Sequence, residues 1–203
     1  MSEPVRKRLT QLRAFFDRAA PDWAERSFDL ERARDHLIEA GLTAGQAVVD
    51  LGAGTGHFLP VIRRIIGCCG RLTALDLSQE MLDRCDATTS HATLICGSVE
   101  DLPLQPDSFD AALCIGLLPH FADRARALAE IHRVIRPGGC LTVLHMIGRE
   151  HLNRLHQHIG GAVAHDLLPC EAEMRASLEA VGFRVDRVAD EPEFYLTVAR
   201  RAC

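Results

Sequence analysis

The chain has 203 residues, enough for one domain of ordinary size and too few for a catalytic domain with a separate substrate domain. Apolar residues make up 47% and charged residues 25%, a globular composition that excludes disordered and fibrous classes. A net charge of -5 and 5% aromatic residues disfavour a nucleic-acid partner, which would need excess Lys and Arg and rings for base stacking. The single lysine, Lys7, lies near the N-terminus, so the core lacks the amine that Schiff-base and pyridoxal chemistry require.

The cysteines and the apolar runs indicate the cellular compartment of the protein. None of the eight cysteines forms a C-x-x-C pair, which disfavours a zinc ribbon, a thioredoxin-type site and a cysteine-ligated iron–sulfur cluster. We find no apolar run of signal-peptide length at the start and nowhere 18 consecutive apolar residues. We therefore expect a cytoplasmic protein with reduced thiols and no membrane span.

The first half of the chain alternates segments typical of helices and of strands. Two helices come first, and Ser27 is placed to cap the second. In chain order we expect helix 8–19, helix 28–40, strand 47–51, a glycine turn at 52–56, helix 57–66, strand 71–76, helix 78–85 and strand 92–96. Such alternation is the pattern of a parallel sheet covered on both faces.

The second half continues this pattern and ends in a hairpin. In chain order we expect a loop at 101–108, strand 109–115, helix 123–136, strand 140–145, helix 150–159, a helix containing Met174, Leu178 and Val181, and strands 183–189 and 193–200. The short Asp190-Glu191-Pro192 link predicts that the last strand runs antiparallel to its neighbour. The predicted fold is a single α/β domain, a doubly wound, mostly parallel seven-stranded sheet with an antiparallel last strand and helices on both faces.

The strongest motif is Asp50-Leu51-Gly52-Ala53-Gly54-Thr55-Gly56, between a buried strand and a helix. Glycines allow a sharp turn there and let a ligand approach main-chain atoms. Asp76 follows Gly56 by 20 residues, at the end of the next strand, where a carboxylate can accept both hydroxyls of a ribose. Together they indicate a ligand that contains a nucleoside.

The glycine spacing distinguishes between nucleoside ligands. The dinucleotide fingerprint is G-x-G-x-x-G, whereas this chain has G-x-G-x-G with His57 in the expected third position. Asp50 would repel a diphosphate but suits a ligand with an ammonium or sulfonium group. An NAD-dependent oxidoreductase is therefore the less favoured alternative.

These motifs resemble those of class I S-adenosylmethionine-dependent methyltransferases with a Rossmann-like fold, in the branch that includes the menaquinone and ubiquinone biosynthesis methyltransferases. The resemblance covers about residues 12–146. It rests on four segments in order: Val48 to Gly56, Ala74 to Leu82, Gly97 to Leu104 followed by Asp107-Ser108-Phe109-Asp110, and Ile131 to Gly139. Phe15 to Trp23 also resembles a family segment that often folds over the bound cofactor, although Ala24 replaces the acid after the aromatic residue.

The resemblance implies S-adenosylmethionine as cofactor and S-adenosylhomocysteine as product. It implies that the glycines flank the methionine portion, Asp76 the ribose, Leu77 and Val99 the adenine faces, Ser98 the adenine amine, and the backbone of Cys114 the methionine end. The family more often has Asp or Asn at the position of Ser98. The full predicted cofactor set is Asp50, Gly52, Ala53, Gly54, Thr55, Gly56, Asp76, Leu77, Met81, Ser98, Val99 and Cys114.

Methyl transfer from a sulfonium is a one-step displacement, so the protein's main task is to align donor and acceptor in a dry pocket. A phenol or amine acceptor usually has to lose a proton to a positioned side chain. His120 follows the fourth strand and His145 ends the fifth, at the edge of the sheet where ligands bind. Both are candidate catalytic bases, with orienting or packing roles as the alternative.

Five of the ten histidines lie between 145 and 165. Because no two are at i, i+4 on one helix, we expect a polar lid over the acceptor pocket rather than a metal site. Arg149, Arg154 and these histidines could instead bind an anionic acceptor. Cys68-Cys69 and Cys170 raise the further possibility of a soft metalloid acceptor.

The prediction is a methyltransferase that transfers a methyl group by direct displacement to a small-molecule acceptor. It comprises an N-terminal arm or lid (1–26), a cofactor-binding core (46–146), an acceptor-side insert (147–170) and a C-terminal helix and hairpin (171–203). We expect a monomer or homodimer. A non-catalytic S-adenosylmethionine-binding partner subunit is a further alternative, and the identity of the acceptor is left open.

Overall fold

The computed structural model describes residues 1–202, apart from the side chains of Ala87 and Thr89. Cys203, the last residue of the predicted C-terminal unit, lies outside the described residues. The strands are β1 (Ala47–Leu51), β2 (Arg71–Asp76), β3 (Thr93–Cys96), β4 (Phe109–Ile115), β5 (Ile135–His145), β6 (Phe183–Asp190) and β7 (Tyr195–Arg201). The α-helices are α1 (Glu3–Ala24), α2 (Leu30–Glu39), α3 (Leu59–Ile66), α4 (Gln79–Leu82), α5 (Ala87–Ser90), α6 (Arg124–Val134), α7 (Arg149–Ile159) and α8 (Glu171–Glu179). Short 3-10 turns are η1 (Val99–Asp101), η2 (Leu118–His120) and η3 (Gly161–Val163).

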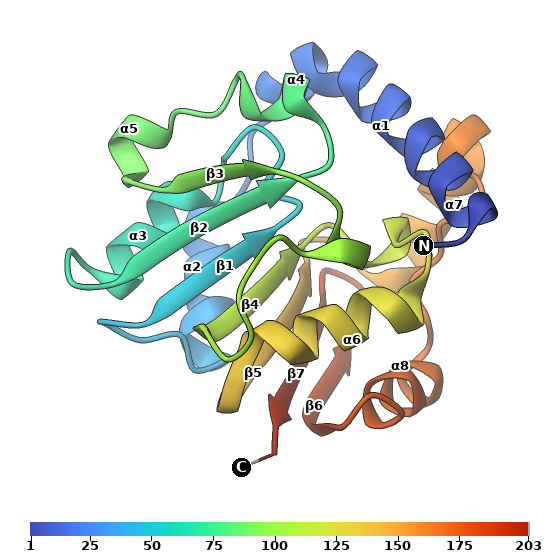
Figure 1. Ribbon diagram of the computed structural model, residues 1–203. Coiled ribbons are helices and arrows are strands. Elements are labelled where there is room, and N and C mark those ends of the chain that lie inside the picture. The colour runs from blue at the N-terminus through green and yellow to red at the C-terminus, as the bar shows by residue number, and fades with distance from the viewer. Residues whose placement is uncertain (203) are drawn as a thin grey trace.

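The seven strands form one sheet in the order β3-β2-β1-β4-β5-β7-β6 (Figure 1). The pairs from β3 to β5 are parallel, and β7 is antiparallel to both β5 and β6. The chain winds outward from β1 in one direction and from β4 in the other. This confirms the predicted doubly wound sheet with an antiparallel last strand, and it creates a crevice at the carboxyl ends of β1 and β4.

Helices cover both faces of the sheet, and each face has its own apolar core. Successive side chains of a strand point to opposite faces. Val48 thus packs with α2 and α3, whereas Val49 and Leu51 pack with α6 and α8. Near-continuous apolar strands are typical of a sheet that is buried on both sides.

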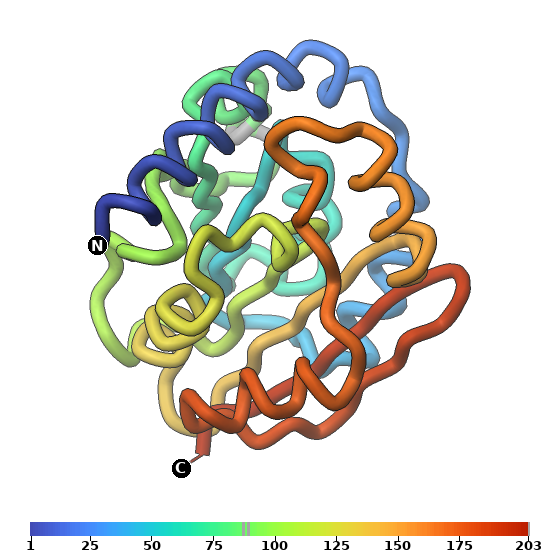
Figure 2. Tube along the Cα trace, turned by 90° about the vertical axis from the view of Figure 1, so that its right-hand side faces the viewer, coloured from blue at the N-terminus to red at the C-terminus, as the bar shows by residue number. Residues whose placement is uncertain are grey.

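Helix α1 crosses the carboxyl edge of the sheet (Figures 1 and 2), and its N-terminal half contacts η3, where Arg8 donates to the carbonyl oxygen of Ala162. It runs from Glu3 to Ala24 and is longer than the predicted 8–19 at both ends. Pro21 lies within its last turn, yet the helix continues because Ala20 is buried and Trp23 packs inward over the glycine turn. Within the described part of the chain, no helix is long and apolar enough to cross a membrane.

Other boundaries also differ from the prediction. Asp29, not Ser27, caps α2, since its carboxylate accepts a hydrogen bond from the amide of Arg32. Helix α3 begins at Leu59 rather than at 57. The predicted helix 78–85 is regular only over Gln79–Leu82, with Ser78 as its cap.

The predicted helix 123–136 ends at Val134, and β5 begins at Ile135 rather than at Cys140. Ile135 pairs with Phe109 of β4, and the register then shifts before Ala111 pairs with Cys140. The Pro-Gly-Gly segment is therefore an irregular part of the strand rather than a stop before it.

Candidate active site

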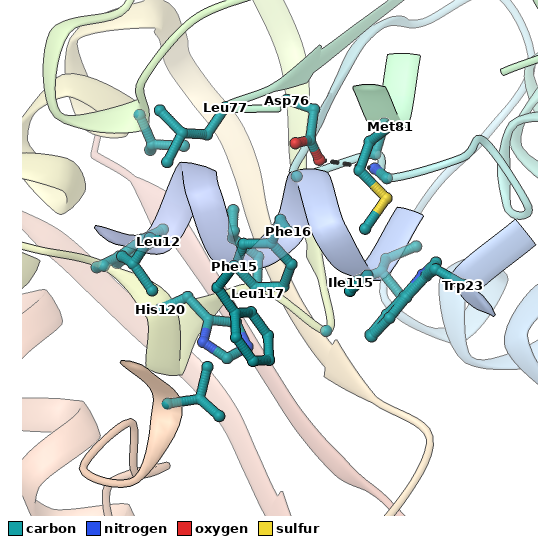
Figure 3. A pocket seen from close by; sticks show the side chains of 18 of the residues that line it. Leu12, Phe15, Phe16, Trp23, Asp76, Leu77, Met81, Ile115, Leu117 and His120 are labelled. Atoms are coloured by element: carbon teal, nitrogen blue, oxygen red, sulfur yellow. Dashed lines mark hydrogen bonds between the residues drawn. The ribbon is translucent and has the colours of Figure 1, made fainter. Parts of the chain in front are cut away.

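A cavity of about 420 Å³ lies at the carboxyl edge of the sheet, beneath α1. Its size is within the range of small-molecule sites. It is lined by the loops after β1 to β5, by the inner face of α1 and by α7. Figure 3 shows Asp76 and Met81 at one side of α1 and His120 with Phe16 at the other.

The glycine turn forms one wall of this cavity. Its three glycines have φ values of +71° (Gly52), +56° (Gly54) and +82° (Gly56), which side-chain-bearing residues rarely adopt. A Cβ at Gly52 would lie 2.6 Å from Leu117 Cδ1, and one at Gly56 would lie 2.3 Å from Cys85 Sγ. The turn therefore needs glycine both for its backbone and for its packing.

Asp76 ends β2 and is bonded to the glycine turn. Its Oδ2 accepts from the amide of Gly54 at 2.8 Å, and its Oδ1 accepts from the amide of Ser78 at 2.8 Å. Burial raises the pKa of Asp76, while these amide bonds act in the opposite direction. Each carboxylate oxygen can accept more than one hydrogen bond, so Asp76 retains acceptor capacity toward the cavity that it lines.

Asp50 is a buried carboxyl group that lacks a full set of partners. It lines the cavity and is 2% exposed, and its Oδ1 has no hydrogen-bond partner among the described residues. Burial raises the pKa of Asp50 to about 8, and the nearby Asp76 adds to this rise. An unpaired buried acid beside a cavity fits a cationic ligand group, because such a group would stabilise the carboxylate.

Most of the predicted cofactor residues line the cavity. They are Asp50, Gly52, Ala53, Gly54, Asp76, Leu77, Met81, Ser98 and Val99. Thr55, Gly56 and Cys114 lie outside the lining. Thr55 Oγ1 is 2.9 Å from His57 Nδ1, and Cys114 is fully buried in the core, where burial raises the pKa of its thiol. Ile115 and Gly116 take the place of Cys114 in the cavity wall.

Ser98 is hydrogen-bonded to Glu100, a residue that no sequence motif indicated. Its hydroxyl donates to the buried carboxylate of Glu100 and accepts from the amide of Glu100 at 3.2 Å. Glu100 in turn accepts from the amide of Ala122 at 2.7 Å. This network fixes the loop after β3 against the start of α6.

His120 stands at the other end of the cavity and is held by a carboxylate. Its Nδ1 is 2.7 Å from Asp166 Oδ2, and both side chains are less than 10% exposed. Its ring packs edge-on against Phe16 and lies 5.0 Å from the ring of His156. Nε2 of His120 makes no hydrogen bond within the described residues. Asp166 was missed because no local pattern connects it with His120, which is 46 residues away.

Comparisons with known proteins agree with this geometry. Residues 49–143 match the family model for a methyltransferase domain. This match covers somewhat less than half of the chain. A ubiquinone/menaquinone biosynthesis C-methyltransferase from Psychromonas ingrahamii is 32% identical over 111 residues, which are 52% of this chain and 44% of that protein. The chain spans less than half the length of the curated relatives that it matches first.

Solved structures of such proteins share the fold. A SAM-dependent methyltransferase from Aquifex aeolicus has a TM-score of 0.68 at 23% identity, over 85% of this chain and 89% of that one. A methyltransferase from a complex with the Haloferax volcanii Trm112 methyltransferase activator has a TM-score of 0.72 at 23% identity, over 93% and 98%. The predicted Rossmann-like fold is confirmed, and the matches agree with the predicted class, an S-adenosylmethionine-dependent methyltransferase, and with its cofactor.

His145, the second candidate base, differs from His120. It is almost fully buried, and its Nε2 has no partner among the described residues. Burial lowers the pKa of His145 to about 3, with further lowering from the nearby His120 and His156. A histidine so resistant to protonation is a weak base, so the geometry favours His120 for proton transfer.

Helix α7 presents apolar rather than polar side chains to the cavity. Leu152, Leu155 and Ile159 line it together with His156, whereas His151, His158 and His165 are exposed. The sequence carried this signal as apolar residues at helical spacing. Of the five histidines expected to form a polar lid, only His145 and His156 line the cavity, so the polar lid is wrong as predicted.

The anionic-acceptor alternative is also not supported. Arg149 pairs with Asp190 at 2.5 Å, Arg154 is exposed beside Glu150, and neither lines the cavity. Among the described residues, no group of three or more His, Cys, Asp or Glu side chains is arranged to hold a metal ion. Cys68 and Cys69 are exposed between α3 and β2, away from the cavity.

Proposed function

We propose that this protein transfers a methyl group from S-adenosylmethionine to a small, largely apolar acceptor by direct displacement. The observation that carries the proposal is a single cavity with two buried acids beside a glycine turn at one end and a carboxylate-held histidine at the other. Both reactants would then meet in a site from which most water is excluded.

The residues at the glycine turn fit the cofactor. When bound, its sulfonium supplies the methyl group. Asp76 would accept hydrogen bonds from the ribose hydroxyls, and Asp50 would face positive charge of the methionine portion. Leu77 and Val99 would hold the adenine between them, and the adenine amine would have to share Ser98 with Glu100.

The acceptor end of the cavity has few groups that could pair with a charged acceptor. Its lining is mainly aliphatic and aromatic and includes Leu9, Leu12, Phe16, Phe121, Leu152, Leu155, Ile159 and Val163. The arginines of α7 are paired elsewhere. An uncharged acceptor with a hydrophobic body therefore fits better than an anion.

His120 would remove the proton from the acceptor. Asp166 accepts a hydrogen bond from Nδ1–H, which leaves the lone pair of Nε2 available. For a phenol or an enol, the proton moves to Nε2 while the acceptor oxygen forms the new bond to the methyl carbon. The electrons of the broken carbon–sulfur bond stay on sulfur. Such general-base assistance contributes about 100-fold or more to the rate.

Incubation of the protein with methyl-labelled S-adenosylmethionine and an extract of the source cells tests this proposal. We expect the label in a small, hydrophobic product identified by mass spectrometry, and His120→Asn should reduce its formation about 100-fold. Tight cofactor binding without any labelled product would instead favour a non-catalytic subunit. A labelled protein or nucleic acid would contradict the small-molecule acceptor.

The remaining assignments are also proposals. The division into arm, core, insert and C-terminal unit agrees with α1 and α7 lying over the sheet edge. A cytoplasmic location is supported by seven described cysteines that are all free thiols. The structural relative bound to an activator suggests that a protein partner should be sought alongside the monomer and homodimer, by light scattering of the purified protein.

A further inference from the structure

Helix α1 is bonded to the rest of the domain at both ends of the cavity. Near its start, Arg8 donates to the carbonyl oxygen of Ala162 at 2.5 Å. Farther along, Arg13 Nε donates to the carbonyl oxygen of Leu77 at 3.1 Å, and Asp17 accepts from Ser78 Oγ at 2.5 Å. Leu77 and Ser78 directly follow Asp76, so one helix contacts both the cofactor segment and the acceptor side.

The contact on the acceptor side reaches His120 through Asp166. Arg8 is paired with Asp166 Oδ1, and Asp166 Oδ2 is 2.7 Å from His120 Nδ1. The Asp166 side chain is only 7% exposed, so both of its partners act on a poorly solvated carboxylate. These residues come from three separate parts of the chain: α1, the segment between η3 and α8, and η2.

We propose that Arg8 and Asp166 are positioning residues for His120. Asp166 holds the imidazole with Nδ1 protonated and Nε2 available, and Arg8 ties this pair to α1. The base is therefore aligned when α1 is seated over the cofactor segment. The proposal rests on the proposed function, in which Nε2 of His120 accepts the proton of the acceptor.

The electrostatics give this arrangement a distinctive signature. Asp166 faces His120 directly, with the Arg8 cation behind it. His156 of α7 lies beside the ring and His145 lies at the end of β5, while the uncharged Phe16 of α1 packs against the ring. Arg18 of α1 and His165 line the same hollow as Arg8 and Asp166. Removing the anion should disfavour the protonated imidazole, and removing the cation should favour it. A residue that merely stabilised the fold would not produce opposite effects.

A ring-proton NMR titration of His120, assigned with His120→Asn, measures this signature without an acceptor. The His120 titration midpoint should move by about 1 pH unit to lower pH in Asp166→Asn and by a smaller amount to higher pH in Arg8→Gln. Arg8→Lys keeps the cation and should restore a midpoint close to the original. Arg6→Gln, which changes an exposed arginine of the same helix outside the hollow that Arg8 and Asp166 line, is the matched control and should leave it unchanged.

Labelled methyl transfer completes the test. We expect kcat to fall about 100-fold in Asp166→Asn, with the affinity for S-adenosylhomocysteine changed less than about threefold. Unchanged midpoints, or midpoints that move in the same direction in both variants, would overturn the proposal. If the midpoints move as expected but the unaltered protein transfers no methyl group, the proposed function alone is wrong. If His120→Asn abolishes transfer while Asp166→Asn and Arg8→Gln match the unaltered protein, the positioning role alone is wrong.

Discussion

Asp50→Asn probes the buried acid that the cofactor-binding assignment depends on. The pKa of Asp50 is about 8, against 3.8 for an ordinary aspartate. Between these values the unfolded chain has released a proton that the folded protein still binds, so stability falls as pH rises from about 4 to 8. At 1.36 kcal/mol for each pKa unit, the cost reaches as much as about 5 kcal/mol at pH 7.5. Asparagine has almost the same shape and avoids this cost.

Thermal unfolding of the cofactor-free protein between pH 5 and 9 measures the effect. The Asn variant should have the higher Tm, by roughly 5 °C or more at pH 8, and the difference should shrink toward pH 5. The exposed Asp83→Asn is the matched control, with no such pH-dependent gain expected. A Tm at or below that of the unaltered protein across the whole range would show that burial of Asp50 does not destabilise the fold.

The same variant should bind the cofactor less tightly. Asp50→Asn should weaken the binding of S-adenosylmethionine and S-adenosylhomocysteine at least about tenfold at pH 8. Both ligands carry an ammonium group that loses its anionic partner in this variant. Methylthioadenosine, which lacks that group and has no sulfonium, should bind equally well to both proteins. In calorimetry at pH 7, S-adenosylmethionine should release a proton from the unaltered protein, since a bound cation favours the carboxylate. Equal losses for all three ligands would contradict the assignment.

Three further predictions concern other parts of the site. Gly56→Ala should lower the free energy of unfolding in urea by about 2 kcal/mol or more, since its Cβ would meet Cys85 Sγ at 2.3 Å, and adding Cys85→Ala should recover part of the loss. Trp23 is the single tryptophan and lies beside Gly54, so its fluorescence should change saturably with S-adenosylhomocysteine, and Asp76→Ala should abolish the change at the same ligand concentration. Because burial lowers the pKa of His145 to about 3, the unfolded chain binds a proton there from pH 6.5 downward and stability falls. His145→Gln should reduce that acid-induced loss in thermal unfolding, and an unchanged slope would contradict the burial argument.

The sheet and the cofactor end could be predicted because their signals are local. Apolar runs such as 47–51 report strands that are buried on both faces, and the turn from Gly52 to Gly56 needs glycine for reasons confined to its own backbone and packing. The spacing from Gly56 to Asp76 follows from one helix and one strand between them. These features lie within about 30 residues of each other, so tertiary packing has little opportunity to rearrange them.

The acceptor end of the cavity was harder to predict from the sequence, because its contacts join residues that are far apart in the chain. Arg8 and Asp166 are 158 residues apart, and no periodicity connects them. The stripe of Leu152, Leu155 and Ile159 was present in the sequence, but the histidines between them gave a competing interpretation, and only the structure shows that the apolar stripe lines the cavity. The end of α1 was likewise decided by packing around Pro21, which local propensity places outside a helix.

Transfer of label from methyl-labelled S-adenosylmethionine is the most direct test of the proposed activity. The unaltered protein, Asp76→Ala and His120→Asn would be compared in the same extract of the source cells at equal protein concentration. We expect one labelled hydrophobic product, which Asp76→Ala should lose together with binding of S-adenosylhomocysteine. His120→Asn should lose the product and retain that binding. Full product formation by His120→Asn, or no labelled product from a protein that binds the cofactor, would contradict these expectations.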